Sequence, residues 1–138
     1  MIHRLRVDTD GPGATEITAT VAALIPPGDG LATLMVRHTS ASLLITENAD
    51  PEVLVDLRTW LARTVPPTTH PSMADLTHTY EGPDDMPAHI RAMLLPTTLS
   101  IPVTDGRMLL GRWQGVFLFE HRDRGRPREV LLHHRADP

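Results

Sequence analysis

Short apolar runs separated by turn residues dominate the chain and predict a domain rich in β-strands. Ile2 to Val7 alternates apolar and polar residues, which is typical of a half-buried strand. Leu31 to Val36 and Ser42 to Thr46 predict two further strands. Leu99 to Val103 and Met108 to Leu110 flank an Asp-Gly dipeptide, which is the strongest short signal of a hairpin turn. Near the end of the chain, we expect Gly115 to Glu120 and Glu129 to His133 to pair as strands across the loop at 122–127.

Three other segments have helical spacing. Thr15 to Leu24 places apolar residues on one face, and Thr15 is a suitable N-cap. The helix predicted from Asp50 to Arg63 has the best start signal, because Asp50 can cap it and Pro51 fits its first position. Pro87 to Leu95 predicts a third, short helix, and Thr68 to Asp85 a long loop. The expected inward-facing residues of the last two helices are Val53, Leu57, Trp60 and Leu61, then Ile90, Met93 and Leu94.

These elements predict one α+β domain over residues 1–138, with a mostly antiparallel β-sheet and two to three helices. The chain has no cysteine, which excludes disulfides and thiolate metal sites and fits a reducing cytoplasmic location. The net charge of −4 argues against a nucleic-acid partner. No apolar run approaches the roughly 20 residues of a membrane span, so we expect no membrane partner.

A dense group of small polar residues follows the strand at 31–36. His38, Thr39 and Ser40 come first, and Asn48 and Asp50 follow within a dozen residues. A strand that only fills a core does not need so many small polar groups beside one titratable ring. This segment therefore indicates a small-molecule site. Ser40 and Ser42 lack a nucleophile-elbow motif, so a serine hydrolase is poorly supported.

Three histidines are the leading candidates for a shared site: His38, His78 and His89. Three imidazoles and a water form a common arrangement for zinc or another divalent metal ion. Their sequence spacing matches no established metal motif, and the alternative is that each makes a separate surface or capping hydrogen bond. The acidic turn that contains Glu81 and Asp84–Asp85 could bind a cation or orient a histidine. Alternatively, Asp84 or Asp85 simply caps the following helix.

All thirteen basic residues are arginines, whose forked side chains suit phosphate. Arg91, two residues beyond His89, is the best phosphate candidate, whereas arginines 124–128 fit a solvated surface. Trp113 and Gln114 combine a large ring and an amide beside a glycine. They could contact a ligand, although Trp113 would equally suit a core.

Several blocks of the chain together resemble the YjbQ-like family. They occur in the family's order and span most of the chain. The blocks are His38-Thr39-Ser40-Ala41-Ser42, Glu47-Asn48-Ala49-Asp50-Pro51, residues 81–89, Gly111-Arg112-Trp113-Gln114-Gly115 and Glu120-His121-Arg122-Asp123. The resemblance implies a compact α+β protein that assembles as a homotrimer. It also implies a histidine-rich site and a secondary thiamine-phosphate synthase activity. Pro96 and Arg112 depart from the family's pattern.

The implied reaction joins a pyrimidine carried on pyrophosphate to a thiazole phosphate, with pyrophosphate as the leaving group. The site must therefore neutralise charge, by arginine or by a divalent metal ion such as zinc or magnesium. A non-catalytic trimer that binds a small anion or a metal, and a metal-dependent hydrolase, remain alternatives. Under the first interpretation the expected roles are: catalytic, His38, His89 and Asp50; metal-binding, His38, His78 and His89; phosphate-binding, Ser40, Arg91 and Arg122; substrate-binding, Thr39, Asn48, Glu81, Trp113 and Gln114.

Overall fold

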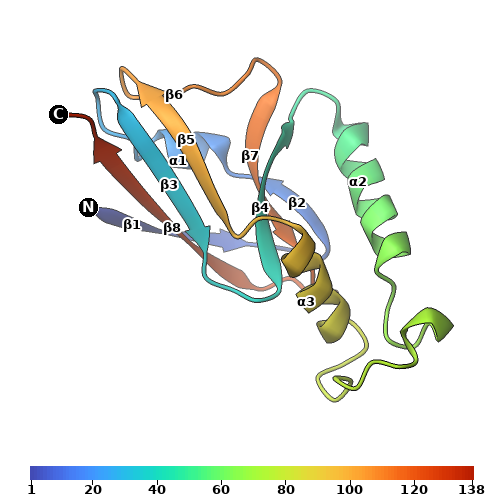
Figure 1. The fold of residues 1–138 in the computed structure, drawn as a ribbon. Helices are drawn as coiled ribbons and strands as arrows, with labels where there is room; N and C mark the ends of the chain where they lie inside the picture. The colour runs from blue at the N-terminus through green and yellow to red at the C-terminus, as the bar shows by residue number, and fades with distance from the viewer.

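Two antiparallel β-sheets, three α-helices and a short 3-10 helix (η1) make up the fold in the computed structural model, which describes all 138 residues (Figure 1). The larger sheet has the strand order β1-β8-β3-β5-β6, and the smaller sheet has the order β2-β7-β4. The elements are β1 (Ile2–Asp8), β2 (Gly13–Glu16), α1 (Thr18–Ala22), β3 (Gly30–Val36), β4 (Ala41–Glu47), α2 (Pro51–Thr64), η1 (Pro71–Met73), α3 (Asp85–Leu94), β5 (Thr98–Thr104), β6 (Arg107–Met108), β7 (Gln114–Glu120) and β8 (Pro127–Ala136). This arrangement confirms the α+β class.

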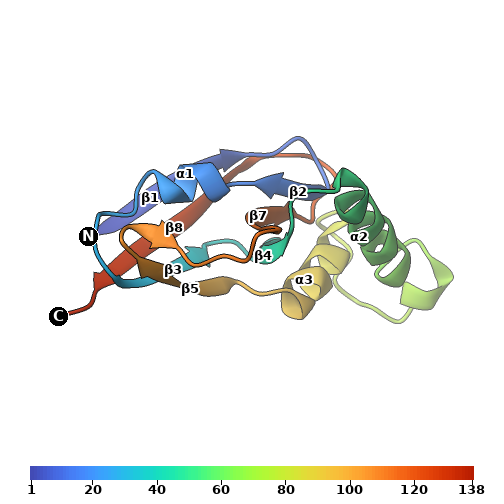
Figure 2. The same cartoon turned by 90° about the horizontal axis from the view of Figure 1, so that it is seen from above.

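The main core lies between the two sheets and draws on six strands and the α1 region. Sixteen buried apolar residues form it, among them Leu34 on β3, Leu118 on β7 and Leu132 on β8. Helices α2 and α3 lie beside the smaller sheet, at the end of the molecule away from both chain termini (Figure 2). A second, smaller core fills the space between these helices and the sheet, around Leu61, Val65 and Phe119.

Strand β7 is therefore covered on both faces. Because side chains alternate along a strand, Val116 and Leu118 point into the core between the sheets, whereas Phe119 packs against residues of the α2 region. Every residue of β7 after Gln114 is buried. The polar residues at its end, Glu120 and His121, are consequently buried as well, one on each face.

The locally encoded elements were predicted correctly. Helix α2 begins where expected, and the Asp50 side chain accepts a hydrogen bond of 2.9 Å from the backbone N–H of Glu52. The hairpin between β5 and β6 turns at Asp105 and Gly106, whose φ angles are 49° and 73°. Positive φ at both central residues is the geometry that a tight hairpin requires and that Asp-Gly favours.

Two predictions of secondary structure were wrong. Thr15 to Leu24 does not form one helix, because residues 13–16 pair with β7 and only Thr18–Ala22 is helical. Strands β7 and β8 do not pair with each other. β7 lies between β2 and β4, and β8 lies between β1 and β3, so the loop that joins them crosses from one sheet to the other. In both places, distant strand partners outweigh the local sequence pattern.

The predicted inward faces of two helices also need correction. Trp60 on α2 is 54% exposed, and Met93 and Leu94 on α3 are 77% and 57% exposed. On α3 the buried residues include two charged ones, Asp85 and Arg91. They can be buried because both have hydrogen-bond partners within the protein. Apolar residues are thereby left on the exposed side of the helix.

Candidate metal centre

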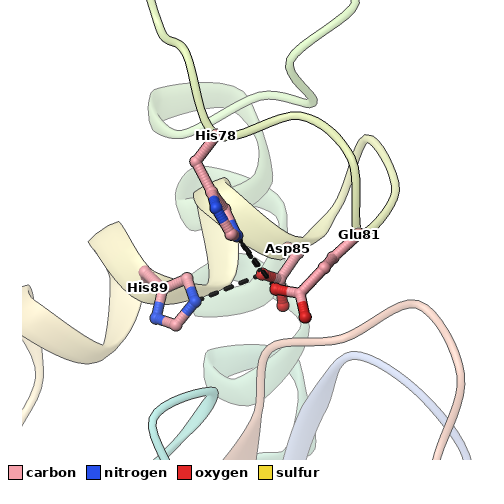
Figure 3. Close-up of side chains that lie close together, drawn as sticks. All are labelled: His78, Glu81, Asp85 and His89. Carbon is pink, nitrogen blue, oxygen red and sulfur yellow. Dashed lines mark hydrogen bonds and ion pairs between the residues drawn. The ribbon is translucent and has the colours of Figure 1, made fainter.

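Four side chains of metal-binding type converge at the start of α3: His78, Glu81, Asp85 and His89 (Figure 3). Their candidate ligand atoms all lie within 4.8 Å of one another. His78 Nε2 is 2.7 Å from Asp85 Oδ2 and 3.0 Å from Glu81 Oε2. His89 Nε2 lies 3.2 Å from the same Asp85 oxygen. Two imidazoles therefore face one carboxylate, with a second carboxylate alongside.

Local structure explains how these residues meet. Asp85 and His89 are four residues apart on α3, and that spacing puts them on the same face of the helix. His78 and Glu81 come from the segment just before α3, where Gly82 adopts a φ of 102° that favours glycine. The His78 ring also lies edge-on to the His89 ring, with 5.6 Å between ring centroids. The chain thus folds back over the first turn of α3.

Arg122 holds Asp85 in place through the carboxylate oxygen that does not face the histidines. Its Nη1 donates a hydrogen bond of 2.7 Å to Asp85 Oδ1, and its Nε donates one of 2.8 Å to Asp84 Oδ2. One oxygen of Asp85 is therefore held by the guanidinium, while the other faces the two histidines. Such support behind a carboxylate is typical of metal ligands, whose own partners set their orientation.

The charges in the cluster favour a cation. The hydrogen bond with Asp85 raises the pKa of His78 above its ordinary value of 6.5, and the nearby Glu81 adds to this effect. Burial alone would raise the pKa of Asp85, but its hydrogen bond with His78 and the charge of Arg122 lower it overall. Asp85 is consequently ionised at neutral pH, and its charge attracts either a proton on His78 or a metal ion in its place.

The residues present fit a divalent metal ion. Two ligands of a tetrahedral zinc ion with bonds of about 2.1 Å lie about 3.4 Å apart. The nitrogen–oxygen distances of 2.7, 3.0 and 3.2 Å would need only small movements to reach that separation. Imidazole ligands suit zinc and other transition metals better than magnesium. Asp85 is 6% exposed at its side chain, whereas Glu81 is 55% exposed, so one side of the cluster is open to solvent.

Comparison with known proteins places the chain in a family. The family model described as "UPF0047 protein YjbQ-like" matches residues 3–137. The chain belongs to the UPF0047 family. The UPF0047 protein sll1880 of Synechocystis is 46% identical over 132 residues, which cover 94% of this chain and 87% of that protein. UPF0047 protein YjbQ of Salmonella typhimurium is 45% identical over 116 residues, covering 84% and 80% of the two chains.

Solved structures with the same fold extend this comparison. The conserved hypothetical protein TT1486 of Thermus thermophilus has a TM-score of 0.85 at 36% identity, and the match covers 96% of this chain and 99% of that one. An uncharacterised YjbQ/UPF0047 protein of Clostridium acetobutylicum has a TM-score of 0.80 at 30% identity, with 98% and 99% covered. These relatives are described as hypothetical or uncharacterised, so the family gives the fold and not an activity.

The three histidines that we expected to share one site divide into two groups. The structure brings His78 and His89 together but leaves His38 outside their cluster. His38 Nε2 accepts a hydrogen bond of 2.8 Å from the backbone N–H of Glu129 on β8. This bond places the ring proton on Nδ1. Burial, followed by the charge of Arg128, lowers the pKa of His38. His38 therefore holds the end of β3 against β8.

The neighbours of His38 also differ in their surroundings. Ser40 is buried, and both its carbonyl and its Oγ accept hydrogen bonds from Arg128, at 3.1 and 2.9 Å. Thr39 is exposed and lines a shallow surface hollow together with His38. Asp50 is the N-cap of α2. The polar segment predicted as one site thus contributes mainly to the framework of the fold.

Three other residues predicted to bind substrate lie together, but at the opposite end of β7. The Asn48 backbone N–H donates to the carbonyl of Trp113, and Gln114 Oε1 accepts from the N–H of Gly111. Trp113 is 54% exposed, and the guanidinium of Arg112 lies 4.6 Å from its ring centroid. Because β7 spans seven residues, this group lies about 20 Å along the strand from its Glu120 end.

Asp85 was not among the predicted site residues, although the acidic turn that contains it was expected either to bind a cation or orient a histidine, or to cap the helix. The structure supports the first interpretation, because Asp85 contacts His78 and His89, whereas neither Asp84 nor Asp85 makes a side-chain cap hydrogen bond. The available signal was the spacing Glu81, Asp85, His89, which repeats every four residues into a predicted helix start. The contact with Arg122, which lies 37 residues away along the chain, could not be read from that spacing.

Proposed function

We propose that this UPF0047 protein is a metal-dependent enzyme that acts on phosphorylated small molecules, with formation of thiamine phosphate as the reaction to test first. The cluster of His78, Glu81, Asp85 and His89 carries this proposal. It combines two imidazoles, two carboxylates, a supporting arginine and an open side. Structural ion pairs alone do not require two histidines to converge on one carboxylate oxygen.

The proposed reaction breaks the bond between the pyrimidine methylene carbon and the pyrophosphate oxygen. A bond from that carbon to the thiazole nitrogen replaces it. A divalent ion held by the cluster would neutralise charge on the departing pyrophosphate. Within the protein, Asp85 and the two histidines would hold that ion, and Arg122 keeps Asp85 in position. Glu81 lies at the exposed rim, where it would orient the substrate from the solvent side.

Metal binding is the first measurement. Purified protein would be stripped with a chelator, dialysed against zinc, manganese or magnesium, and analysed for bound metal. We expect about one transition-metal ion per chain in the wild type and much less in the double variant His78→Ala/His89→Ala. His133→Ala is the matched control, because His133 is an exposed histidine on β8 outside the cluster.

Turnover is the second measurement, and it separates the alternatives. Metal-loaded protein would be given the two thiamine precursors, and the release of pyrophosphate and of inorganic phosphate would be followed separately. Pyrophosphate together with thiamine phosphate supports the proposal. Inorganic phosphate alone would favour a metal-dependent hydrolase. Metal binding without turnover would leave a non-catalytic metal- or anion-binding protein as the better interpretation.

We also propose that the protein assembles as a homotrimer, as the family resemblance implies. An exposed apolar groove between α2 and α3 supports an association of this kind. Its volume is about 270 Å³, and all of its lining residues are apolar, Trp60 and Leu94 among them. Light scattering across a dilution series should give a mass near three chains. A mass of one chain at every concentration would contradict this proposal.

A further inference from the structure

Three arginines have largely buried side chains, but only two of them have a carboxylate partner. Arg128 pairs with Glu120, and Arg122 pairs with Asp84 and Asp85. Arg91 on α3 is 9% exposed and forms no ion pair. Its Nη2 donates a hydrogen bond of 2.7 Å to the carbonyl of Val65, and its Nη1 donates one of 3.3 Å to the carbonyl of His121. Arg91 is thus a buried cation surrounded by neutral acceptors.

A buried charge of this kind is incompletely compensated. A guanidinium has five N–H groups, and two backbone carbonyls leave most of that capacity and all of the charge without a partner. Arg91 Nε is buried and has no acceptor within the protein. The carboxylates that influence it through space, Asp123 and Asp84, do not reach hydrogen-bond distance. An anion beside Arg91 would supply the missing charge.

Arg91 lies in the wall of a cavity that could admit such an anion. The cavity has a volume of about 180 Å³, and its other lining residues include Arg58 on α2, Asp123, Pro12 and Phe119. Arg58 is exposed and also forms no ion pair. The cavity adjoins a larger hollow of about 540 Å³ between α2 and the turn before β2, and Pro12, Arg58 and Asp123 line both. A small ligand could extend from one into the other.

We propose that this cavity binds the phosphate group of a small phosphorylated metabolite, with Arg91 and Arg58 as its cationic contacts. Two arginines match the charge of a phosphate monoester and donate in the geometry that its oxygens accept. Asp123 on the same wall disfavours a ligand that is anionic throughout. It favours a phosphate monoester whose other end carries a hydroxyl or amine that can donate a hydrogen bond to the Asp123 carboxylate.

The phosphate pocket goes beyond the proposed metal centre and does not depend on it. The cavity shares no lining residue with the cluster of His78, Glu81, Asp85 and His89. His89 and Arg91 are two residues apart on α3, which corresponds to about 200° around the helix, so their side chains leave on nearly opposite faces. Phosphate binding can therefore be measured on protein whose metal has been removed by chelation.

The test is calorimetric titration of the full chain with inorganic phosphate, in chelator and at fixed ionic strength. Arg58→Gln removes the exposed contact without disturbing the core and should weaken phosphate binding about tenfold, since a charge-assisted hydrogen bond contributes about 1.5 kcal/mol. Arg63→Gln is the matched control, because Arg63 is an exposed arginine on α2 that does not line the cavity. It should change binding less than about twofold. The double variant His78→Ala/His89→Ala should bind phosphate like the wild type.

Two results would contradict the proposed phosphate pocket. One is the absence of phosphate binding at millimolar concentration, and the other is an equal loss of phosphate affinity in Arg58→Gln and Arg63→Gln. Loss of phosphate binding in the histidine double variant, but not in Arg58→Gln, would place the anion at the metal cluster instead. Arg91→Gln is a second test variant. Its phosphate affinity is compared with that of the wild type once a cooperative thermal melt shows that the variant is folded. A folded Arg91→Gln variant that binds phosphate normally would also reject the proposal.

Discussion

Two polar clusters flank the end of β7, and they use similar residues for different purposes. The inner cluster lies between the sheets, where Glu120 and Arg128 are 0% and 2% exposed. The outer cluster lies beside α3 and contains His78, Asp85 and His89. Both contain a carboxylate held by an arginine. The two clusters differ in how many of their polar atoms have a hydrogen-bond partner within the protein.

The inner cluster is closed. Glu120 accepts hydrogen bonds from Thr9 Oγ1, from Arg128 and from the backbone N–H groups of His121 and Arg122. Burial alone would raise the pKa of Glu120, but the hydrogen bonds from Arg128 and Thr9 lower it overall. In the outer cluster, two histidines compete for one oxygen of Asp85, and one side faces solvent. A saturated cluster indicates a structural role, whereas an open one with excess ligand atoms indicates a binding site.

The largest expected effect comes from breaking the inner cluster. Glu120→Gln keeps the shape of the side chain but leaves Arg128 as a buried cation without a carboxylate partner, although Ser40 still accepts hydrogen bonds from it. We expect the free energy of unfolding to fall by about 3–5 kcal/mol, the usual result of removing one member of a buried ion pair. Urea denaturation at neutral pH would measure this loss. Metal affinity of the folded fraction should stay at the wild-type value, because the outer cluster does not use Glu120.

A surface ion pair provides the control for this comparison. Glu129 pairs with Arg4 and Arg37 at the protein surface, so Glu129→Gln should change the stability very little.

The pH dependence of the stability adds a further check on Glu120. Because its folded pKa is lowered, Glu120 stabilises the fold above its ordinary pKa of 4.5, and this stabilisation is lost as the pH falls toward the folded pKa. Equal losses in Glu120→Gln and Glu129→Gln would show that the buried carboxylate stabilises the fold no more than a surface carboxylate does.

The second prediction breaks the outer cluster. His89→Ala should lower metal affinity by at least about 10- to 100-fold, the loss reported for residues that only support a ligand. Turnover of the thiamine precursors should fall with it. The stability should change by about 1 kcal/mol or less, because the His89 side chain is 36% exposed. Metal titration and a thermal melt on the same samples would separate these effects. A variant with wild-type metal affinity would show that His89 is not a ligand.

The third prediction concerns the pH dependence of metal binding. His78 must lose its proton before Nε2 can bind a metal, and Asp85 raises the pKa of His78 above 6.5. Below that raised pKa, metal affinity should fall about tenfold for each pH unit, since one proton competes for the site. Above it, affinity should level off. Titrations of zinc at several pH values would show this bend. In His78→Ala, the bend due to His78 should disappear.

The contrast between local and distant interactions also explains what the sequence could predict. The start of α2 at Asp50 and the turn at Asp105–Gly106 depend on neighbouring residues, and both were predicted correctly. The partners of β7 are set by residues 13–16 and 41–47, which no local pattern specifies. For the same reason, helical spacing at Thr15 to Leu24 gave the wrong element.

The candidate site shows the same limit. The sequence brought His78 and His89 into one hypothesis but also included His38, because all three lie at element ends or in loops. Only the fold shows that His38 contacts β8 while the other two contact Asp85. A histidine that accepts a backbone hydrogen bond and one that meets a carboxylate look alike in a sequence. The partner of His38, Glu129, lies 91 residues away along the chain, whereas Asp85 lies within seven residues of both His78 and His89.

The smallest expected effect tests that distinction. His38→Ala removes the acceptor for the backbone N–H of Glu129, so the free energy of unfolding should fall by about 1 kcal/mol, the usual net contribution of one hydrogen bond. Metal affinity should be unchanged. His133→Ala, on the exposed face of β8, should alter neither quantity. Denaturation and metal titration of the three proteins would decide the role of His38. A loss of metal affinity in His38→Ala that matches the loss in His89→Ala would return His38 to the metal centre, since a ring that only supports β8 has no means of changing metal binding.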